Sequence, residues 1–187
     1  MRIIGDVTKV LSQQIHACLR FLGEEYISLD YTIEVIGSRK KLEKERQTSK
    51  ILKEEEYQQI LDGKFEPPGV CIHEKKLIRL FRFNLNDILD KDKQTIEFIA
   101  NLYHEVRHAY QFQKGMFPNE KEIAVIDDDP KAYFNLSYEI DAYKFQEEQI
   151  NKNQVGICNV MRIYSSVRMG KQRFVYQIKP EISAYWD

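Results

Sequence analysis

The chain has 187 residues, of which 43% are hydrophobic and 30% charged, and this length is typical of one domain with a substantial core. The 28 Lys and Arg residues almost balance the 29 Asp and Glu residues, which argues against a protein dedicated to nucleic acid or anionic membranes. Three widely separated cysteines, a charged N-terminus and the absence of an apolar run of about 20 residues predict a cytoplasmic protein with reduced thiols and no membrane partner.

The first third of the chain carries three patterns. Apolar residues recur at helical spacing over residues 7–22, which predicts an amphipathic helix. Apolar and polar residues alternate from Ile27 to Val35, which predicts a half-buried strand. Residues 39–62 are the most charged stretch and hold few apolar residues, so we expect one or two solvated helices there, within a charged elaboration of residues 38–66. A contact region for a protein partner, through residues 39–62, is the alternative for this stretch.

Strand and helix patterns alternate in the rest of the chain. Two runs rich in Ile, Leu and Phe predict a β-hairpin, Val70–His73 with Leu77–Leu85. A strongly patterned helix is predicted over residues 94–114, with Gly115 supplying the position after its C-terminus. The remaining expected elements are a helix over residues 137–150 capped by Asn135 or Ser137, and two strand-like runs, Val160–Val167 and Arg173–Ile178.

The patterned helix contains the motif H-E-x-x-H, from His104 to His108. Residues four apart on a helix are rotated by about 40° and separated by about 6 Å along the axis, so two imidazoles with this spacing can converge on one tetrahedral zinc ion. Glu105 lies about 100° around the helix from His104, beside such an ion, where a carboxylate can accept a proton from water. Val106 points away from both histidines, toward the expected core. The motif therefore predicts a zinc site with an adjacent base.

A glutamate on the next predicted helix adds to the motif. The segment from Tyr138 to Ala142 places Glu139 in an E-x-x-A setting on the next predicted helix, 31 residues after His108. H-E-x-x-H followed by such a glutamate resembles the gluzincin metallopeptidases, particularly small single-domain forms such as minigluzincins and SprT-like proteins. The resemblance covers a core of about residues 70–150. It implies an α+β, zincin-like single domain over residues 1–187, in which a small mixed or antiparallel sheet packs on the H-E-x-x-H helix and the glutamate helix. The strand Leu77–Phe83 is expected to edge the active cleft.

The resemblance also implies roles for individual residues. His104, His108 and Glu139 would bind one Zn²⁺ per chain, and Glu105 would be the catalytic general base. Asp141 is the second choice for the third ligand. The side chain that stabilises the transition state is left open among Tyr143, Tyr164 and Arg107, with Tyr138 and Arg168 as further possibilities. The other two histidines, His16 and His73, are expected to be structural.

These features predict a zinc-dependent metallopeptidase that acts on a peptide or protein substrate, with no nucleic-acid partner. Two alternatives belong to other classes. The first is a catalytically weak or inactive zincin-like module with a binding or regulatory role in a bacterial or mobile-element system. The second is an interaction module that works through residues 39–62.

Overall fold

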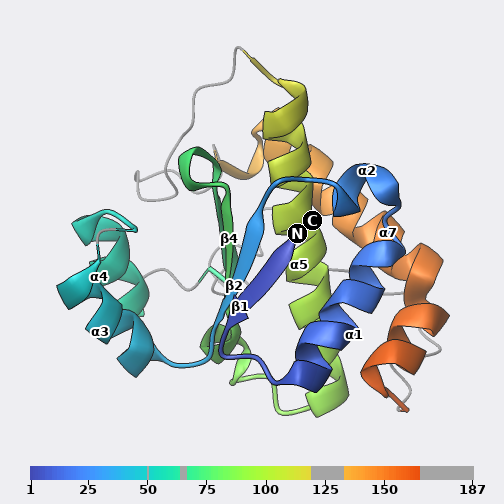
Figure 1. The fold of residues 1–187 in the computed structure, drawn as a ribbon, viewed down its shortest axis with the longest axis horizontal. Helices are drawn as coiled ribbons and strands as arrows, with labels where there is room; N and C mark the ends of the chain where they lie inside the picture. The colour runs from blue at the N-terminus through green and yellow to red at the C-terminus, as the bar shows by residue number, and fades with distance from the viewer. Residues whose placement is uncertain (50, 64–66, 119–132, 165–187) are drawn as a thin grey trace.

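A computed structural model describes residues 1–49, 51–63, 67–118 and 133–164 (Figure 1). The strands are β1 (Arg2–Gly5), β2 (Thr32–Ile36), β3 (Gly69–Ile72) and β4 (Leu77–Phe81). The α-helices are α1 (Lys9–Arg20), α2 (Glu24–Ile27), α3 (Arg39–Thr48), α4 (Glu54–Asp62), α5 (Lys91–Lys114) and α7 (Ser137–Met161). Two 3-10 turns flank β4, η1 (His73–Lys75) and η2 (Arg82–Leu85). The expected α+β class with a small mixed sheet is confirmed.

The four strands form one sheet in the order β1-β2-β4-β3. β1, β2 and β4 run parallel, and β3 pairs antiparallel with β4, as the predicted hairpin requires. Leu77–Phe83, the strand expected to edge the active cleft, forms β4 over Leu77–Phe81. β4 lies inside the sheet because its backbone pairs with both β2 and β3, which leaves β3 at the edge of the described sheet. The hairpin is also shorter than expected, since residues 82–85 coil into η2.

The sheet buries both of its faces. Ile78 and Leu80 of β4 belong to a large core shared with α1, α5 and α7, whereas Phe81 belongs to a second core shared with α3 and α4. Successive side chains of a strand point to opposite faces, which explains this division. Figure 1 shows the result, with α3 and α4 on one side of the sheet and α1, α5 and α7 on the other.

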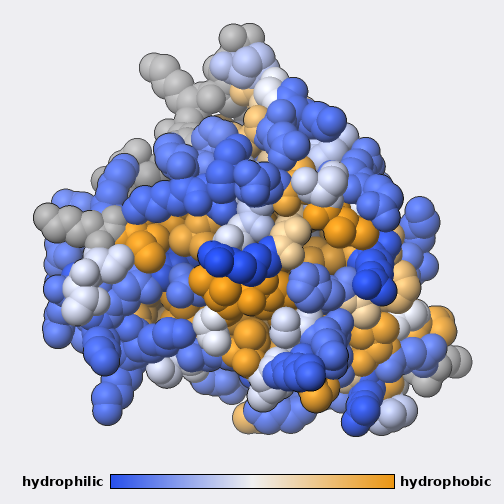
Figure 2. All heavy atoms as spheres, viewed as in Figure 1, coloured by the Kyte–Doolittle hydropathy of each residue, from blue (hydrophilic) through white to orange (hydrophobic). Residues whose placement is uncertain are grey.

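The charged segment 39–62 forms two helices, as expected, but it is more than a solvated cover. Leu42 and Tyr57 are buried in the second core, and the outer surface of both helices stays mostly hydrophilic (Figure 2). Arg79 of β4 lies fully buried beneath them and binds Glu34 of β2 and Glu45 of α3. The segment therefore covers one face of the sheet. Its high charge had not indicated this packing role.

The strand expected from Ile27 begins five residues late. Ile27 ends the short helix α2, and the N–H groups of Ser28 and Leu29 bond back to Glu24 and Tyr26. These local turns use the donors that a strand would need, so β2 begins only at Thr32. The predicted alternation still marks buried side chains, because Leu29 points into the core.

Helix α5 is three residues longer at its start than predicted. The side chain of Asp90 accepts hydrogen bonds from the N–H groups of Asp92 and Lys93, which caps the helix one turn early. The helix ends at Gly115, whose φ of +61° gives the left-handed conformation expected there.

Helix α7 continues eleven residues beyond its expected end at residue 150. Gly156 lies inside it, and the ring of Phe21 packs there so closely that a Cβ on Gly156 would lie 2.7 Å from the nearest ring atom. The residue before the helix is Leu136, with no side-chain cap, so the predicted caps were wrong. The strand predicted over Val160–Val167 was wrong over its described residues, because Val160 and Met161 are helical and residues 162–164 are not in a strand. Its residues from 165 on, and Arg173–Ile178, lie outside the described residues.

In the part of the chain that the structure describes, no helix is both long and apolar enough to cross a membrane.

Candidate metal centre

The polar side of α5 is buried against α7 instead of facing solvent. Only 4% of His104 and 7% of His108 is exposed, and Asn101, Glu105 and Gln111 are buried with them. The sheet and α1 cover the apolar side of the same helix. Because both sides are covered, the two histidines lie in an interior where imidazole and carboxylate groups need partners.

The side chains of three possible ligands meet between α5 and α7. The Nε2 atoms of His104 and His108 are 2.9 Å apart, and the two carboxylate oxygens of Glu139 lie 3.2 Å from the first and 3.3 Å from the second. Ligands about 2.0–2.1 Å from a tetrahedral zinc ion are separated by about 3.3 Å from one another. All three residues are buried and close enough to hold one metal ion, so the three expected ligands come together in a candidate metal site whose metal is not identified.

The electrostatics of this cluster favour a cation. Burial alone would raise the pKa of Glu139, but the charge of His108 and hydrogen bonds with both histidines outweigh it, so the pKa lies well below its usual range. Burial would lower the pKa of His108, but the Glu139 carboxylate raises it instead. The Glu139 carboxylate thus favours a positive charge beside it. A metal ion would replace the proton that supplies this charge.

Glu105 lies beside the cluster and against the edge strand. A Cβ on Gly69, the first residue of β3, would lie 2.7 Å from Cγ of Glu105 and 2.9 Å from its Oε1, so the backbone of β3 passes directly over this side chain. Burial raises the pKa of Glu105 to about 8, against the opposing effect of the His108 charge. A buried carboxyl group that titrates near neutral pH is suited to exchange protons.

Asp141, the second choice for the third ligand, points away from the cluster. Its oxygens accept hydrogen bonds from Nε and Nη2 of Arg107, at 2.6 and 3.1 Å, and from Nε2 of Gln111 at 2.7 Å. Arg107 also donates to the hydroxyl of Tyr26 at 2.6 Å and lies over the ring of Phe145. Arg107, which had been considered as a stabiliser of the transition state, is thus committed to joining α5, α7 and α2.

The candidate tyrosines lie at different distances from the cluster. The ring of Tyr143 packs on His104, with centroids 4.4 Å apart, and the ring of Tyr138 meets His108 edge-on at 5.9 Å. Tyr164 is 78% exposed, and its N–H group donates to Asp92 near the start of α5. Asp92 is twelve residues from His104, about 18 Å along the helix, which removes Tyr164 from the site. Arg168 lies outside the described residues.

Two residues that the sequence reasoning did not single out belong to the site. The hydroxyl of Tyr133 donates to Oε1 of Glu139, and the side chain of Gln111 contacts His108. Gln111 lies three residues after His108 on the same side of the helix, so helical spacing alone would have indicated it. Tyr133 precedes the predicted glutamate helix, and no local pattern distinguishes it.

The other two histidines lie outside this group. His73 stacks on Phe112, with ring centroids 4.5 Å apart, and its Nδ1 lies 3.3 Å from the hydroxyl of Tyr31. Neither His73 nor His16 belongs to the group of possible ligands found among the described residues.

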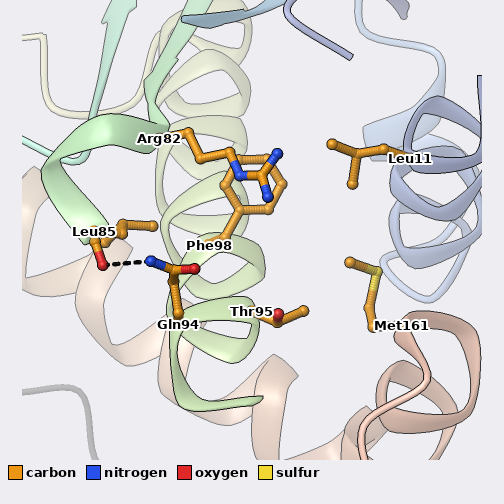
Figure 3. Close-up of a pocket in the computed structure, with 7 residues that line it drawn as sticks. All are labelled: Leu11, Arg82, Leu85, Gln94, Thr95, Phe98 and Met161. Carbon is orange, nitrogen blue, oxygen red and sulfur yellow. Dashed lines mark hydrogen bonds between the residues drawn. The ribbon is translucent and has the colours of Figure 1, made fainter. Parts of the chain in front are cut away.

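A pocket opens at the other end of α5, between α1, η2 and α7 (Figure 3). It is lined by Leu11, Arg82, Leu85, Gln94, Thr95, Phe98 and Met161. The amide of Gln94 is bound to the carbonyl oxygen of Leu85 at 2.8 Å, as the dashed line in Figure 3 shows. Thr95 is nine residues before His104, about 14 Å along the helix, so the pocket is separate from the metal centre.

Comparison of the chain with protein-family models, with curated proteins and with solved structures gave no match. The candidate metal centre therefore rests on the geometry of this chain.

Proposed function

We propose that the protein is a zinc-dependent metallopeptidase of the gluzincin type, in which His104, His108 and Glu139 hold the ion and Glu105 is the general base. The observation that carries the proposal is that the side chains of His104, His108 and Glu139 are buried and lie close together. The carboxyl group of Glu105 lies beside them.

The ligand set supports zinc in a catalytic role. Two imidazoles and one carboxylate are ligands that Zn²⁺ accepts, and three protein ligands leave a fourth coordination position for water or substrate. Purely structural zinc sites have four protein ligands. Within the described residues the group contains three, His104, His108 and Glu139.

The position of Glu105 supports hydrolysis. A bound zinc ion would act as a Lewis acid that lowers the pKa of water to about 7 and polarises a carbonyl group. Glu105 would accept a proton from the attacking water and return it to the departing amine. Its burial beside His108 places a carboxyl group next to the proposed ligands, where it can both accept and donate a proton.

The edge strand supports a peptide as the substrate. Val70 and Ile72 pair with β4, and Phe81 donates to the carbonyl oxygen of Pro68. Because backbone groups alternate in direction along an antiparallel pair, the N–H and C=O groups of Gly69 point away from β4. An extended peptide can pair with such an edge by backbone hydrogen bonds. A peptide bound there would pass beside Glu105, which contacts Gly69.

The test compares wild-type protein with Glu105→Gln in a peptide-library cleavage assay, both loaded with zinc to the same measured content. We expect the variant to keep zinc and to lose cleavage by about 10²-fold or more, the usual contribution of a general acid–base group. Glu148→Gln, at an exposed position of α7, is the matched control and should cleave as wild type does.

Two outcomes would contradict parts of the proposal. Equal cleavage by wild type and zinc-loaded Glu105→Gln would remove Glu105 from the reaction. A wild-type protein that binds zinc and cleaves no peptide in the library would favour the alternative of a binding or regulatory module.

A further inference from the structure

The side chain of Gln111 connects the metal centre to α7. Gln111 lies one turn after His108 and is only 3% exposed. Its Oε1 is 2.9 Å from Nδ1 of His108, on the side of the ring opposite the ligand atom. Its Nε2 is 2.9 Å from the carbonyl oxygen of Tyr138 and 2.7 Å from a carboxylate oxygen of Asp141.

These contacts determine which atoms donate. The groups on the Nε2 side of Gln111 are a carbonyl and a carboxylate oxygen, which only accept hydrogen bonds, so this side must be the NH₂ group. The atom that faces His108 is therefore the amide oxygen, an acceptor. Nδ1 of His108 must then carry the hydrogen, and in the neutral ring Nε2 keeps its lone pair. The lone pair points to the place where Glu139 and His104 converge.

Asp141 is held in place by Arg107, so the orientation of the His108 ring depends on more residues than Gln111. Arg107 holds both carboxylate oxygens of Asp141 and also binds Tyr26 of α2. A chain of directed hydrogen bonds thus runs from α2 through Arg107, Asp141 and Gln111 to His108.

We propose that Gln111, held by Asp141, is a positioning residue that fixes the tautomer and ring orientation of His108 for metal binding. The inference rests on the proposed metal centre and adds to it a residue that is neither a ligand nor a catalytic group. Partners of this kind raise metal affinity because the ligand is already oriented, and their loss usually costs 10–100-fold in affinity.

The test measures zinc affinity by competition with a chromophoric chelator. Gln111→Met keeps the length of the side chain and removes every hydrogen bond of the amide, so we expect about 10–100-fold weaker zinc binding in a folded protein. The visible spectrum of the Co²⁺-loaded protein should change as well, because His108 would be free to rotate. Gln113→Met, at an exposed position of the same helix, is the control and should match wild type in both measurements.

A second set of variants keeps the proposal testable if Gln111→Met fails to fold. Gln111→Glu alone places two carboxylates side by side, and we expect it to bind zinc weakly. Combining it with Asp141→Asn keeps an acceptor for Nδ1 of His108 and removes the second carboxylate, so zinc affinity should recover relative to Gln111→Glu.

The outcomes separate this inference from the proposed function. A folded Gln111→Met protein with wild-type zinc affinity and Co²⁺ spectrum would overturn the positioning role, even if it were less stable to heat. A double variant that binds zinc no better than Gln111→Glu would also overturn it. If wild type itself bound no zinc, the metal centre would fail and the positioning role with it.

Discussion

Gly69 and Glu105 meet where the edge strand β3 passes α5. A side chain on Gly69 would lie 2.7 Å from Cγ of Glu105, and 3.1 Å from the backbone oxygen of Arg79 on the other side. The backbone of Arg79 belongs to a paired strand and cannot move easily, so Glu105 would have to give way. At the scale of single residues, the absence of a side chain at position 69 sets the position of the proposed base.

Gly69→Ala should therefore separate metal binding from hydrolysis. We expect the variant to retain zinc, because the three atoms nearest to a Cβ at position 69 belong to Glu105 and Arg79 and to none of the proposed ligands, and to lose activity by about 10²-fold, as a displacement of about 1 Å can cause. The measurement is kcat on a peptide identified with the wild-type protein, at equal zinc content.

Gly156→Ala is the control for Gly69→Ala, since it collides with Phe21 at the same 2.7 Å but lies at the far end of α7. It should reduce stability and leave the kcat of the folded, zinc-loaded protein unchanged. If Gly69→Ala also kept its full kcat, Glu105 would not depend on the space that Gly69 provides.

At the scale of elements, α5 is a helix with buried polar residues that extend beyond the metal site. Glu97, seven residues before His104, is partly buried, and this burial raises its pKa to about 7 from an ordinary value of 4.5, against the opposing charge of Lys93. The folded protein thus holds a proton on Glu97 that the unfolded chain has released above pH 4.5. Stability must therefore fall as the pH rises from about 4.5 through 7.

Glu97→Gln should remove this loss of stability. We expect the variant to match wild type near pH 4.5 and to exceed it at pH 8 by up to about 3 kcal/mol in the free energy of unfolding. Urea unfolding at both pH values measures the difference, with the exposed Glu148→Gln as control. A constant difference between the Glu97→Gln and wild-type proteins across this pH range would show that Glu97 is ionised in the folded state.

Helix spacing and strand alternation are local properties, and they predicted the parts of the fold that depend on neighbours in sequence. The spacing of His104 and His108 indicated one metal site, and Gly115 marked the end of α5. The length of α7 could not be predicted, because the packing of Gly156 on Phe21 joins residues that are far apart in the sequence. The role of Asp141 could not be predicted either, since it depends on how α7 is rotated against α5.

At the scale of the whole molecule, the sheet separates two cores, and the charged segment 39–62 contributes to one of them. Leu42 of α3 is fully buried, together with Tyr57 and Ile60 of α4. The ion pairs of Arg79 with Glu34 and Glu45 cross the same face of the sheet. Deleting the segment would therefore uncover this face, so a deletion cannot test whether it binds a partner.

Leu42→Ala tests whether the segment is structural. We expect a loss of about 2–5 kcal/mol in the free energy of unfolding, as for other large-to-small changes in a core. Lys44→Ala, at an exposed position of the same helix, should change stability by no more than about 0.5 kcal/mol. An equally small effect of Leu42→Ala would mean that α3 does not pack on the sheet in solution.

The metal content of the purified protein tests the central claim most directly. Elemental analysis of wild type should give about one zinc per chain, and the double variant His104→Ala/His108→Ala should contain almost none. This expectation follows from two imidazoles and a buried carboxylate within bonding reach of one ion. A wild-type protein without bound metal, or a double variant with unchanged zinc content, would contradict the assignment of this site.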